Sequence, residues 1–377
     1  MEFDEELIKK IKNRIEFNKT KSELLIELVN KTGKVGNNLK KHLGEINKQA
    51  RFLRKNCQPF FKINKINKTF SPNIKSDEIV AIDGSSNIGG QLSGKFISLY
   101  SVAQIHLKLD KRNKLATTEK YWGDMEIIDA LDEKEIEKKL ELKMIRKETE
   151  AYENSINLFG KSCENKFIFI DGPIIDPPNH KDKDYVNFRT DIIRKVLKKK
   201  IILVGCVKRI FGKNFLRFIG NNFEEKETKN KIYSYLNDRY LISSLVTDYR
   251  KKHNFHGTLI SDFYQNEPKK DTAEYYYNLN GIYIKSLFFQ YSTKHRLLRV
   301  DIPFLKFGKD YESNLLQKIK NSLMGFSYPG IDLPYPVHLA HEFSKIRDGC
   351  AETIYDDIIT KNLSNKPINQ IFINMLK

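Results

Sequence analysis

The spacing of apolar residues divides the chain into a helical N-terminal part and a longer part rich in strands. From residue 1 to about residue 56, apolar side chains recur at the three- and four-residue intervals of a helix. The stretch KNCQPFFKINKINKTFSPN, residues 55–73, breaks this pattern with two prolines and is predicted to be a connector. We therefore expect a helical arm with its connector over residues 1–75 and a second domain over residues 76–377. The arm packs either on its own domain or on a second copy of the chain.

Short apolar runs replace the helical spacing from residue 78 onward, and they predict strands. Three runs that end near residues 83, 109 and 129 follow one another closely, as in three strands paired as a meander. The pattern then predicts a long charged helix at 133–159, a strand at 166–175, a helix at 184–199 and a strand at 201–207. This order is typical of the ribonuclease-H-like fold, an α/β class with a mixed sheet flanked by helices.

One motif occurs twice, at the ends of the first and fourth predicted strands. IVAIDGSS, residues 79–86, and FIFIDGPI, residues 167–174, each place an aspartate and a glycine after an apolar run. Asp-Gly is also a common turn pair, so either motif alone could be a turn. In a ribonuclease-H-like sheet, however, these two strands lie side by side, and open α/β sheets bind ligands at the carboxyl ends of their strands. Asp83 and Asp171 are therefore predicted to meet at one edge of the sheet.

Two adjacent carboxylates favour a divalent cation, because their like charges repel and Mg²⁺ or Mn²⁺ takes oxygen ligands. Such a cation can hold the attacking and leaving oxygens of a phosphodiester. A site of this kind normally needs a third carboxylate, and the helix before Asp171 offers Glu148, Glu150 and Glu153. If the buried stripe of that helix runs from Ile145 to Phe159, Glu148 and Glu153 flank it on opposite sides, whereas Glu150 points away. Each glutamate could equally be a solvated surface residue.

A stretch rich in proline and tyrosine stands out near the C-terminus. GFSYPGIDLPYPVHLAHEFSKI, residues 325–346, predicts a helix that begins near Pro336 and carries His338 and His341 one turn apart. A histidine at this place could ligate a metal, orient a phosphate or move a proton near neutral pH. One or both could also serve only to cap or pack the helix.

Composition favours a polyanionic partner. The chain has 66 Lys and Arg against 48 Asp and Glu, a formal charge of +18, which favours nucleic acid over an acidic small molecule. Four cysteines lie far apart without a CxxC pair, which argues against a zinc module and a disulfide framework and for a reducing cytoplasm. The apolar runs are too short to span a membrane, and the N-terminus lacks the apolar core of a signal peptide. We expect a soluble cytoplasmic protein.

Six segments in a fixed order resemble the NurA nucleases of prokaryotic DNA-end processing, over residues 78–346. These segments are IVAIDGSS (79–86), FIFIDGPI (167–174), IILVGCVKR (201–209), NDRYLISSL (237–245), LRVDIP (298–303) and LPYPVHLAH (333–341). The resemblance implies a DNA nuclease that depends on Mn²⁺, with Mg²⁺ as the other candidate ion. It also implies a ribonuclease-H-like core and a homodimer that works with a hexameric HerA-type translocating ATPase.

The resemblance also implies roles for particular residues. Asp83, Asp171 and a helix glutamate would hold the metal ions, and Glu153 is preferred to Glu148 because it lies closer to Asp171 along the chain, as in the family. His341 would be either a metal ligand or a proton donor to the leaving oxygen.

Basic and aromatic residues near these positions are predicted to contact DNA. Lys208 and Arg209 follow a neighbouring strand, where they are placed to bind the phosphate backbone. One position departs from the family, since Leu333 stands where an aromatic residue with a proposed active-site role is common. Tyr335 or Tyr328 could replace that aromatic, and we assign Tyr335 to the DNA-binding set.

Two other functions are compatible with the sequence. Sugar kinases and actin-like ATPases share the core fold and place Asp-Gly loops against phosphate, so IDGSS could bind a nucleotide. Those proteins, however, duplicate the core in a longer chain. A DNA-binding module without catalysis is the second alternative; Leu333 favours it, and the presence of both Asp83 and Asp171 opposes it.

Overall fold

The fold consists of one mixed sheet with helices on both faces. The computed structural model describes residues 21–57, 61–66, 78–92, 95–109, 115–129, 133–160, 163–164, 166–175, 182–210, 212–221, 236–265, 273–305, 309–347 and 349–363. Its strands are β1 (Ile63–Ile66), β2 (Ile79–Leu92), β3 (Lys95–Leu109), β4 (Leu115–Asp129), β5 (Phe167–Asp171), β6 (Ile202–Val207), β7 (Thr258–Ser261), β8 (Tyr283–Gln290) and β9 (Leu298–Phe304). Its helices are α2 (Ser22–Cys57), α3 (Glu133–Phe159), α4 (Lys183–Lys198), α5 (Asn214–Asn221), α7 (Asp238–His253), α8 (Ala273–Leu279), α9 (Lys309–Gly325), α10 (Tyr335–Ser344) and α11 (Cys350–Leu363).

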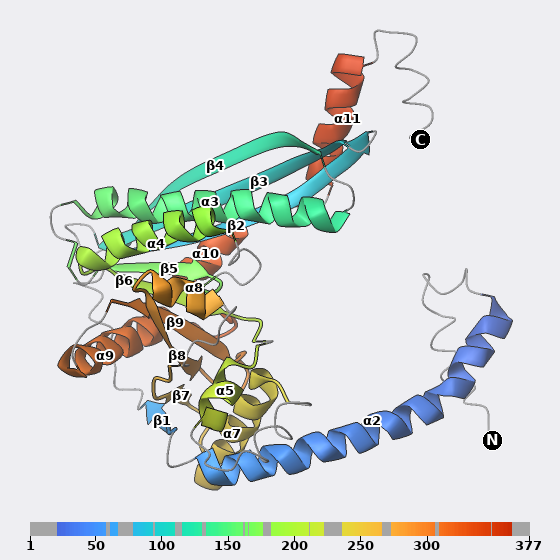
Figure 1. Cartoon of the computed structure of the whole chain (residues 1–377), viewed down its shortest axis with the longest axis vertical. Helices are drawn as coiled ribbons and strands as arrows, with labels where there is room; N and C mark the ends of the chain where they lie inside the picture. Colours follow the sequence, from blue (N-terminus) through green and yellow to red (C-terminus); the bar gives the residue numbers. More distant parts are fainter. Residues whose placement is uncertain are drawn as a thin grey trace.

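The strand order confirms the predicted ribonuclease-H-like core. Within the described residues, nine strands pair in the order β1-β7-β8-β9-β6-β5-β2-β3-β4 (Figure 1). Strands β2, β3 and β4 form the predicted antiparallel meander, whereas β5 pairs in parallel with both β2 and β6. The apolar runs of β2 and β5 are buried because they lie in the middle of this sheet with helices above and below.

Alternate residues of the central strands face two different layers of helices. Helices α3 and α4 cover one face of the sheet, and α9 and α10 lie on the other (Figure 1). Val80 and Ile82 belong to the core on the α3 side, whereas Ile79 and Ala81 belong to the core that includes residues of α9 and α10. Since side chains alternate along a strand, Asp83 continues the row of Ala81 and faces the α10 side.

Helix α3 presents the predicted buried stripe to the sheet. Thr149 and Tyr152 are fully buried, and Arg189 of α4 donates a hydrogen bond to Thr149 Oγ1 at 2.7 Å. The same guanidinium donates to the carbonyl oxygen of Ile174 at 3.1 Å, three residues after Asp171. Arg189 therefore ties both helices to the segment that follows the second Asp-Gly motif.

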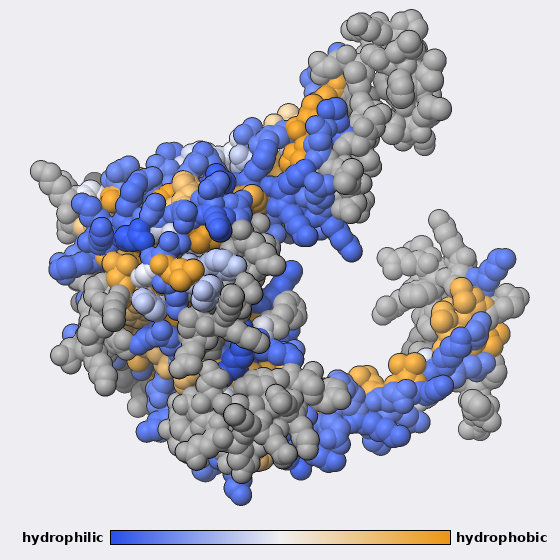
Figure 2. All heavy atoms as spheres, viewed as in Figure 1, coloured by the Kyte–Doolittle hydropathy of each residue, from blue (hydrophilic) through white to orange (hydrophobic). Residues whose placement is uncertain are grey.

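The C-terminal part of the N-terminal arm packs on its own domain, one of the two predicted arrangements. The C-terminal part of α2 packs on α7: Ala50 and Leu53 are buried there, and the Tyr240 hydroxyl donates to Asn47 Oδ1 at 2.6 Å. Further towards its N-terminus, α2 carries exposed apolar side chains, and Val35 is 62% exposed; Figure 2 shows apolar residues gathered along this helix. The prediction for residues 1–20 lies outside the described residues.

The predicted connector contains a strand. Residues Ile63–Ile66 form β1, which pairs antiparallel with β7 at one edge of the sheet. This strand was not predicted, because Ile63 and Ile66 lie three residues apart and four residues are too few to distinguish a strand from a loop without the partner strand. No described helix is long and apolar enough to cross a membrane.

Candidate active site

Asp83 lies at a fork in the sheet. The parallel pairing of β2 with β5 ends at Ile82, whereas the antiparallel pairing of β2 with β3 continues to Leu92. Asp83 and Gly84 therefore lie within a strand, and the alternative that they form a turn was wrong. The expectation that the first strand ends at Asp83 was also wrong, because pairing with β3 extends β2 to Leu92. Asp171 is the last residue of β5 and lies at the same fork.

Helix α10 brings His341 to the two aspartates. Its Nδ1 lies 2.8 Å from Asp83 Oδ2 and 3.3 Å from Asp171 Oδ2. One ligand atom from each of these three residues lies within 4.8 Å of the others, which makes the group a possible metal site. The prediction that the fold joins Asp83 and Asp171 is confirmed.

The electrostatics of this Asp83–Asp171–His341 cluster favour a bound cation. Burial and the neighbouring Asp83 carboxylate raise the pKa of Asp171, and Lys208 opposes this effect through an ion pair, with Nζ 2.6 Å from Asp171 Oδ2. The hydrogen bond with Asp83 raises the pKa of His341. The negative charges of two buried carboxylates are thus balanced by Lys208 and His341. A divalent cation bound between the carboxylates could supply the same positive charge.

A serine that the sequence analysis did not single out also contacts the cluster. Ser344 lies three residues after His341, so both side chains lie on one face of α10. Its hydroxyl donates to Asp83 Oδ2 at 3.1 Å and is buried. Val337 and Ala340 of the same helix are fully buried against the core, which sets the depth at which His341 and Ser344 meet Asp83.

Helix α3 approaches β2 so closely that only a glycine fits after the first aspartate, at Gly84. A Cβ atom at this position would lie 2.6 Å from Glu148 Oε1 and 2.8 Å from Met144 Cγ, so a larger residue would displace side chains of α3. Glu148 therefore lies against β2 at Gly84, on the α3 side of the sheet, whereas the side chain of Asp83 faces α10.

The structure places the other two helix glutamates away from Gly84. Glu153 forms an ion pair with Lys195 of α4, with 2.6 Å between Nζ and Oε1, and its side chain is 46% exposed. Glu150 is exposed and pairs with Lys147, as the helical phase predicted. Of the three glutamates, Glu148 is thus the one that contacts the strand residue next to Asp83, whereas the preferred candidate Glu153 forms an ion pair at the surface.

Two of the three predicted DNA-binding residues lie at the candidate site, and the third does not. Lys208 and Arg209 follow β6, beside the end of β5, as expected, and both line the cavity described below. Tyr335 packs against Tyr328, with 5.5 Å between ring centroids, and does not line that cavity. Leu333 is 4% exposed and belongs to the core, so the position of the family's aromatic residue is filled by a packing side chain.

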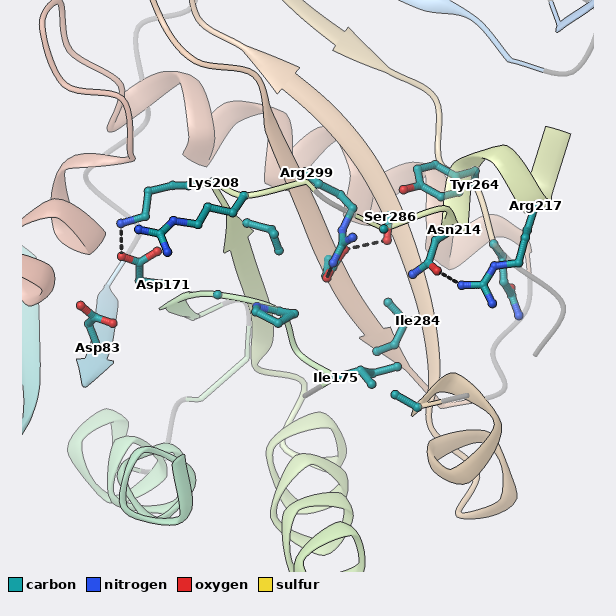
Figure 3. A pocket seen from close by; sticks show the side chains of 18 of the residues that line it. Asp83, Asp171, Ile175, Lys208, Asn214, Arg217, Tyr264, Ile284, Ser286 and Arg299 are labelled. Carbon is teal, nitrogen blue, oxygen red and sulfur yellow. Dashed lines mark hydrogen bonds and ion pairs between the residues drawn. The ribbon is translucent and has the colours of Figure 1, made fainter. Parts of the chain in front are cut away.

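A cavity of about 730 Å³ opens from the Asp83–Asp171–His341 cluster (Figure 3). Its wall includes Arg299, whose guanidinium makes two hydrogen bonds of 2.8 Å to Asp301, and Ser286, whose hydroxyl donates to the same carboxylate at 2.7 Å. Arg299 and Asp301 lie two residues apart in β9 and so share one face. Both residues belong to the segment LRVDIP, but no role was predicted for either of them.

Known proteins resemble this chain in sequence and in fold. The NurA domain matches residues 77–346, well over half of the chain. The structure is similar to the NurA nuclease from Sulfolobus solfataricus, with a TM-score of 0.55, 13% identity, and coverage of 92% of this chain and 99% of that one. A structure of NurA with manganese gives a TM-score of 0.45 and 12% identity, and covers 91% of this chain and 99% of that one. No curated protein matches the sequence. The extent of the domain match shows that this chain belongs to the NurA family.

Proposed function

We propose that this chain is a metal-dependent DNA nuclease that hydrolyses phosphodiester bonds at the Asp83–Asp171–His341 cluster. The observation that carries the proposal is the meeting of two buried carboxylates and a histidine at the mouth of a cavity that also contains Lys208 and Arg209. The acidic side chains can hold a metal cation, and the basic side chains next to them can bind the negatively charged phosphate. The formal charge of +18 supports a polyanionic substrate.

The residues present fit a hard divalent cation. Carboxylate oxygens are the ligands preferred by Mg²⁺ and Mn²⁺, and an imidazole nitrogen is compatible with Mn²⁺. Asp83, Asp171 and His341 would hold the ion, and we propose Mn²⁺ because the family resemblance implies it. When bound, such an ion polarises a phosphodiester and neutralises developing negative charge. We propose Glu148 as the third carboxylate, since Gly84 leaves the space through which its side chain approaches the fork.

The protein's own groups would orient the acidic ligands and the substrate. Ser344 and His341 both contact Oδ2 of Asp83, which fixes the direction of that carboxylate. Lys208 is held by Asp171 in this structure. With Asp171 holding a cation, the ammonium group of Lys208 would be available to bind a phosphate oxygen, and the exposed Arg209 would contact the neighbouring backbone.

We propose the following assembly and setting. The chain acts as a homodimer with a HerA-type hexameric ATPase in DNA end resection in the cytoplasm, as the resemblance implies. Exposed apolar side chains of α2, among them Leu28, Val35 and Leu39, support an interface between copies along the arm. Tyr335, the first residue of α10, is kept as a proposed DNA contact.

The purified protein is expected to degrade end-labelled single- or double-stranded DNA with Mn²⁺ and to lose this activity when EDTA removes the ion. Gel analysis of the products, beside an assay of ATP hydrolysis, separates the three functions considered. ATP hydrolysis without DNA cleavage would support a nucleotide-binding phosphotransferase. Metal-independent DNA binding without cleavage would support a non-catalytic module.

Lys208→Ala is expected to weaken DNA binding about equally for different sequences. Each phosphate contact adds roughly 0.7 to 0.9 to the slope of log affinity against log salt, so the variant should lose about one such contact. Fluorescence anisotropy of labelled oligonucleotides across a salt series, with Ca²⁺ in place of Mn²⁺, measures both effects. The exposed Lys108 near the end of β3 serves as the control, and an equal loss in Lys108→Ala would contradict a local contact.

A further inference from the structure

Helix α10 carries His341 to the two aspartates, although this side chain is not itself held by burial. Val337 and Ala340 are fully buried on the apolar side of the helix, whereas the His341 side chain is 40% exposed. Apolar contacts are not directional, so they hold a helix against a sheet more firmly than they fix its position along its own axis. Hydrogen bonds at one end of the helix are suited to fix that position.

The C-terminal end of α10 is bound by side chains of the sheet. The last carbonyl groups of a helix have no partner inside the helix and need other donors. The Ser101 hydroxyl, from β3, donates to the carbonyl oxygen of Ser344, the last residue of α10. Just after the helix, the backbone N–H of Ile346 donates to Ser85 Oγ of β2, at 3.2 Å. Serines of two strands thus bind backbone groups where the chain leaves α10.

The two serines lie side by side on the face of the sheet that α10 covers. Ser85 of β2 is directly opposite Ser101 of β3 in the antiparallel register. Ser85 also lies two residues after Asp83, so both side chains project from the same face of β2. Asp83 contacts His341 and Ser344, and the Ser85–Ser101 pair contacts the backbone at the end of the same helix.

The two serines of the motif IDGSS, residues 82–86, therefore have different surroundings. Ser85 accepts a hydrogen bond from the chain after α10, whereas Ser86 projects from the opposite face of the strand and is exposed. The first Asp-Gly motif thus provides both a proposed metal ligand, Asp83, and a serine that binds the helix carrying His341.

We propose that Ser85 and Ser101 are positioning residues that hold the C-terminal end of α10 where His341 and Ser344 meet Asp83. The inference rests on the proposed nuclease function and adds the contacts that bring the histidine to the two carboxylates. Loss of either serine leaves a backbone group without its partner and allows the end of the helix to move. His341 Nδ1, which lies 2.8 Å from Asp83 Oδ2, would then be less precisely placed for a shared cation.

Ser85→Ala and Ser101→Ala are each expected to weaken Mn²⁺ binding about fivefold, the effect of one lost hydrogen bond, and to lower kcat for DNA cleavage by a similar factor. KM for DNA should be unchanged, because neither serine lines the cavity beside the cluster. Electron paramagnetic resonance of Mn²⁺ measures binding without turnover. Ser86→Ala, which removes the exposed serine of the same motif, is the matched control and should equal the wild type.

Hydrogen exchange of the metal-free protein tests the contacts directly. In Ser85→Ala, peptides covering residues 341–347 should exchange faster than in the wild type, because the Ile346 amide loses its acceptor, whereas Ser86→Ala should leave the exchange unchanged. Ser85→Thr keeps the hydroxyl and should restore both slow exchange and Mn²⁺ affinity. Thermal melts followed by circular dichroism show whether each variant is folded. If Ser101→Ala is unfolded, Ser85→Ala and its threonine rescue decide the question.

The outcomes distinguish this inference from the proposed function. If the wild type binds Mn²⁺ and cleaves DNA and both alanine variants equal it, the positioning role is refuted and the nuclease proposal stands. Faster exchange near Ile346 with unchanged Mn²⁺ affinity would show that the serines stabilise the helix end without positioning His341, which also refutes the inference. If the wild type neither binds Mn²⁺ nor cleaves DNA, the proposed function fails and the positioning role at a metal site fails with it.

Discussion

Asp83→Asn and Asp171→Asn are each expected to reduce DNA cleavage at least about a hundredfold, which corresponds to about 2.7 kcal/mol of transition-state stabilisation. Each substitution removes one charged oxygen ligand and almost no volume. The remaining carboxylate and His341 cannot replace that charge at the centre of the cluster, where their ligand atoms lie within 4.8 Å of one another.

The fold of both variants should be unchanged. Burial and the charge of Asp83 raise the pKa of Asp171, so neutralising either group relieves repulsion between two buried carboxylates in the metal-free protein. Cleavage under single-turnover conditions, together with thermal melts, separates catalysis from stability. Asp191→Asn, on the exposed side of α4, provides the matched control. Cleavage within about tenfold of the wild type in either cluster variant would refute the metal-site assignment.

Glu148→Gln is expected to reduce cleavage by about tenfold or more, whereas Glu153→Gln should have little effect. Glu148 lies against Gly84 at the fork between β2 and β5, and the proposal is that its side chain turns to the ion held by Asp83. Glu153 is bound to Lys195 at the surface, and an exposed ion pair contributes about 0–1 kcal/mol. The same single-turnover assay measures both changes.

Glu150→Gln is the control for a charge change on α3 away from the sheet, because Glu150 is exposed. Its activity should equal that of Glu153→Gln. If Glu153→Gln lost far more activity than Glu148→Gln, the active form would require a different position of α3 over β2. A crystal structure with Mn²⁺ would then show which carboxylate enters the site.

Periodicity, together with the known strand order of the ribonuclease-H-like fold, was sufficient to predict the central fold. The apolar runs of β2, β5 and β6, interrupted by the amphipathic helices α3 and α4, predicted both the element order and the neighbouring positions of the two Asp-Gly motifs. The reason is that central strands must be apolar on both faces, a pattern that few other elements share. The edge strand β1 was missed because its four residues, Ile-Asn-Lys-Ile, include two polar ones and become recognisable as a strand only through their pairing with β7.

The third carboxylate could not be chosen from the sequence. Glu148 and Glu153 flank the buried stripe of α3 symmetrically, and distance along the chain favoured Glu153. The proposal of Glu148 rests on the position of α3 along β2, which brings Met144 and Glu148 against the backbone of Gly84. The spacing of apolar residues shows which side of a helix faces the sheet. Only the packed structure shows how far the helix is shifted along its own axis.

By itself, the sequence determined the central strands, the aspartates at one sheet edge and the histidine on the helix that follows, because each depends on a local pattern and a known strand order. Only the tertiary structure decided that Ser344 contacts Asp83, that Lys208 pairs with Asp171 and that Arg217 faces the same cavity. These contacts join residues far apart in the chain. Their side chains meet through the packing of whole helices and strands, which no local pattern encodes.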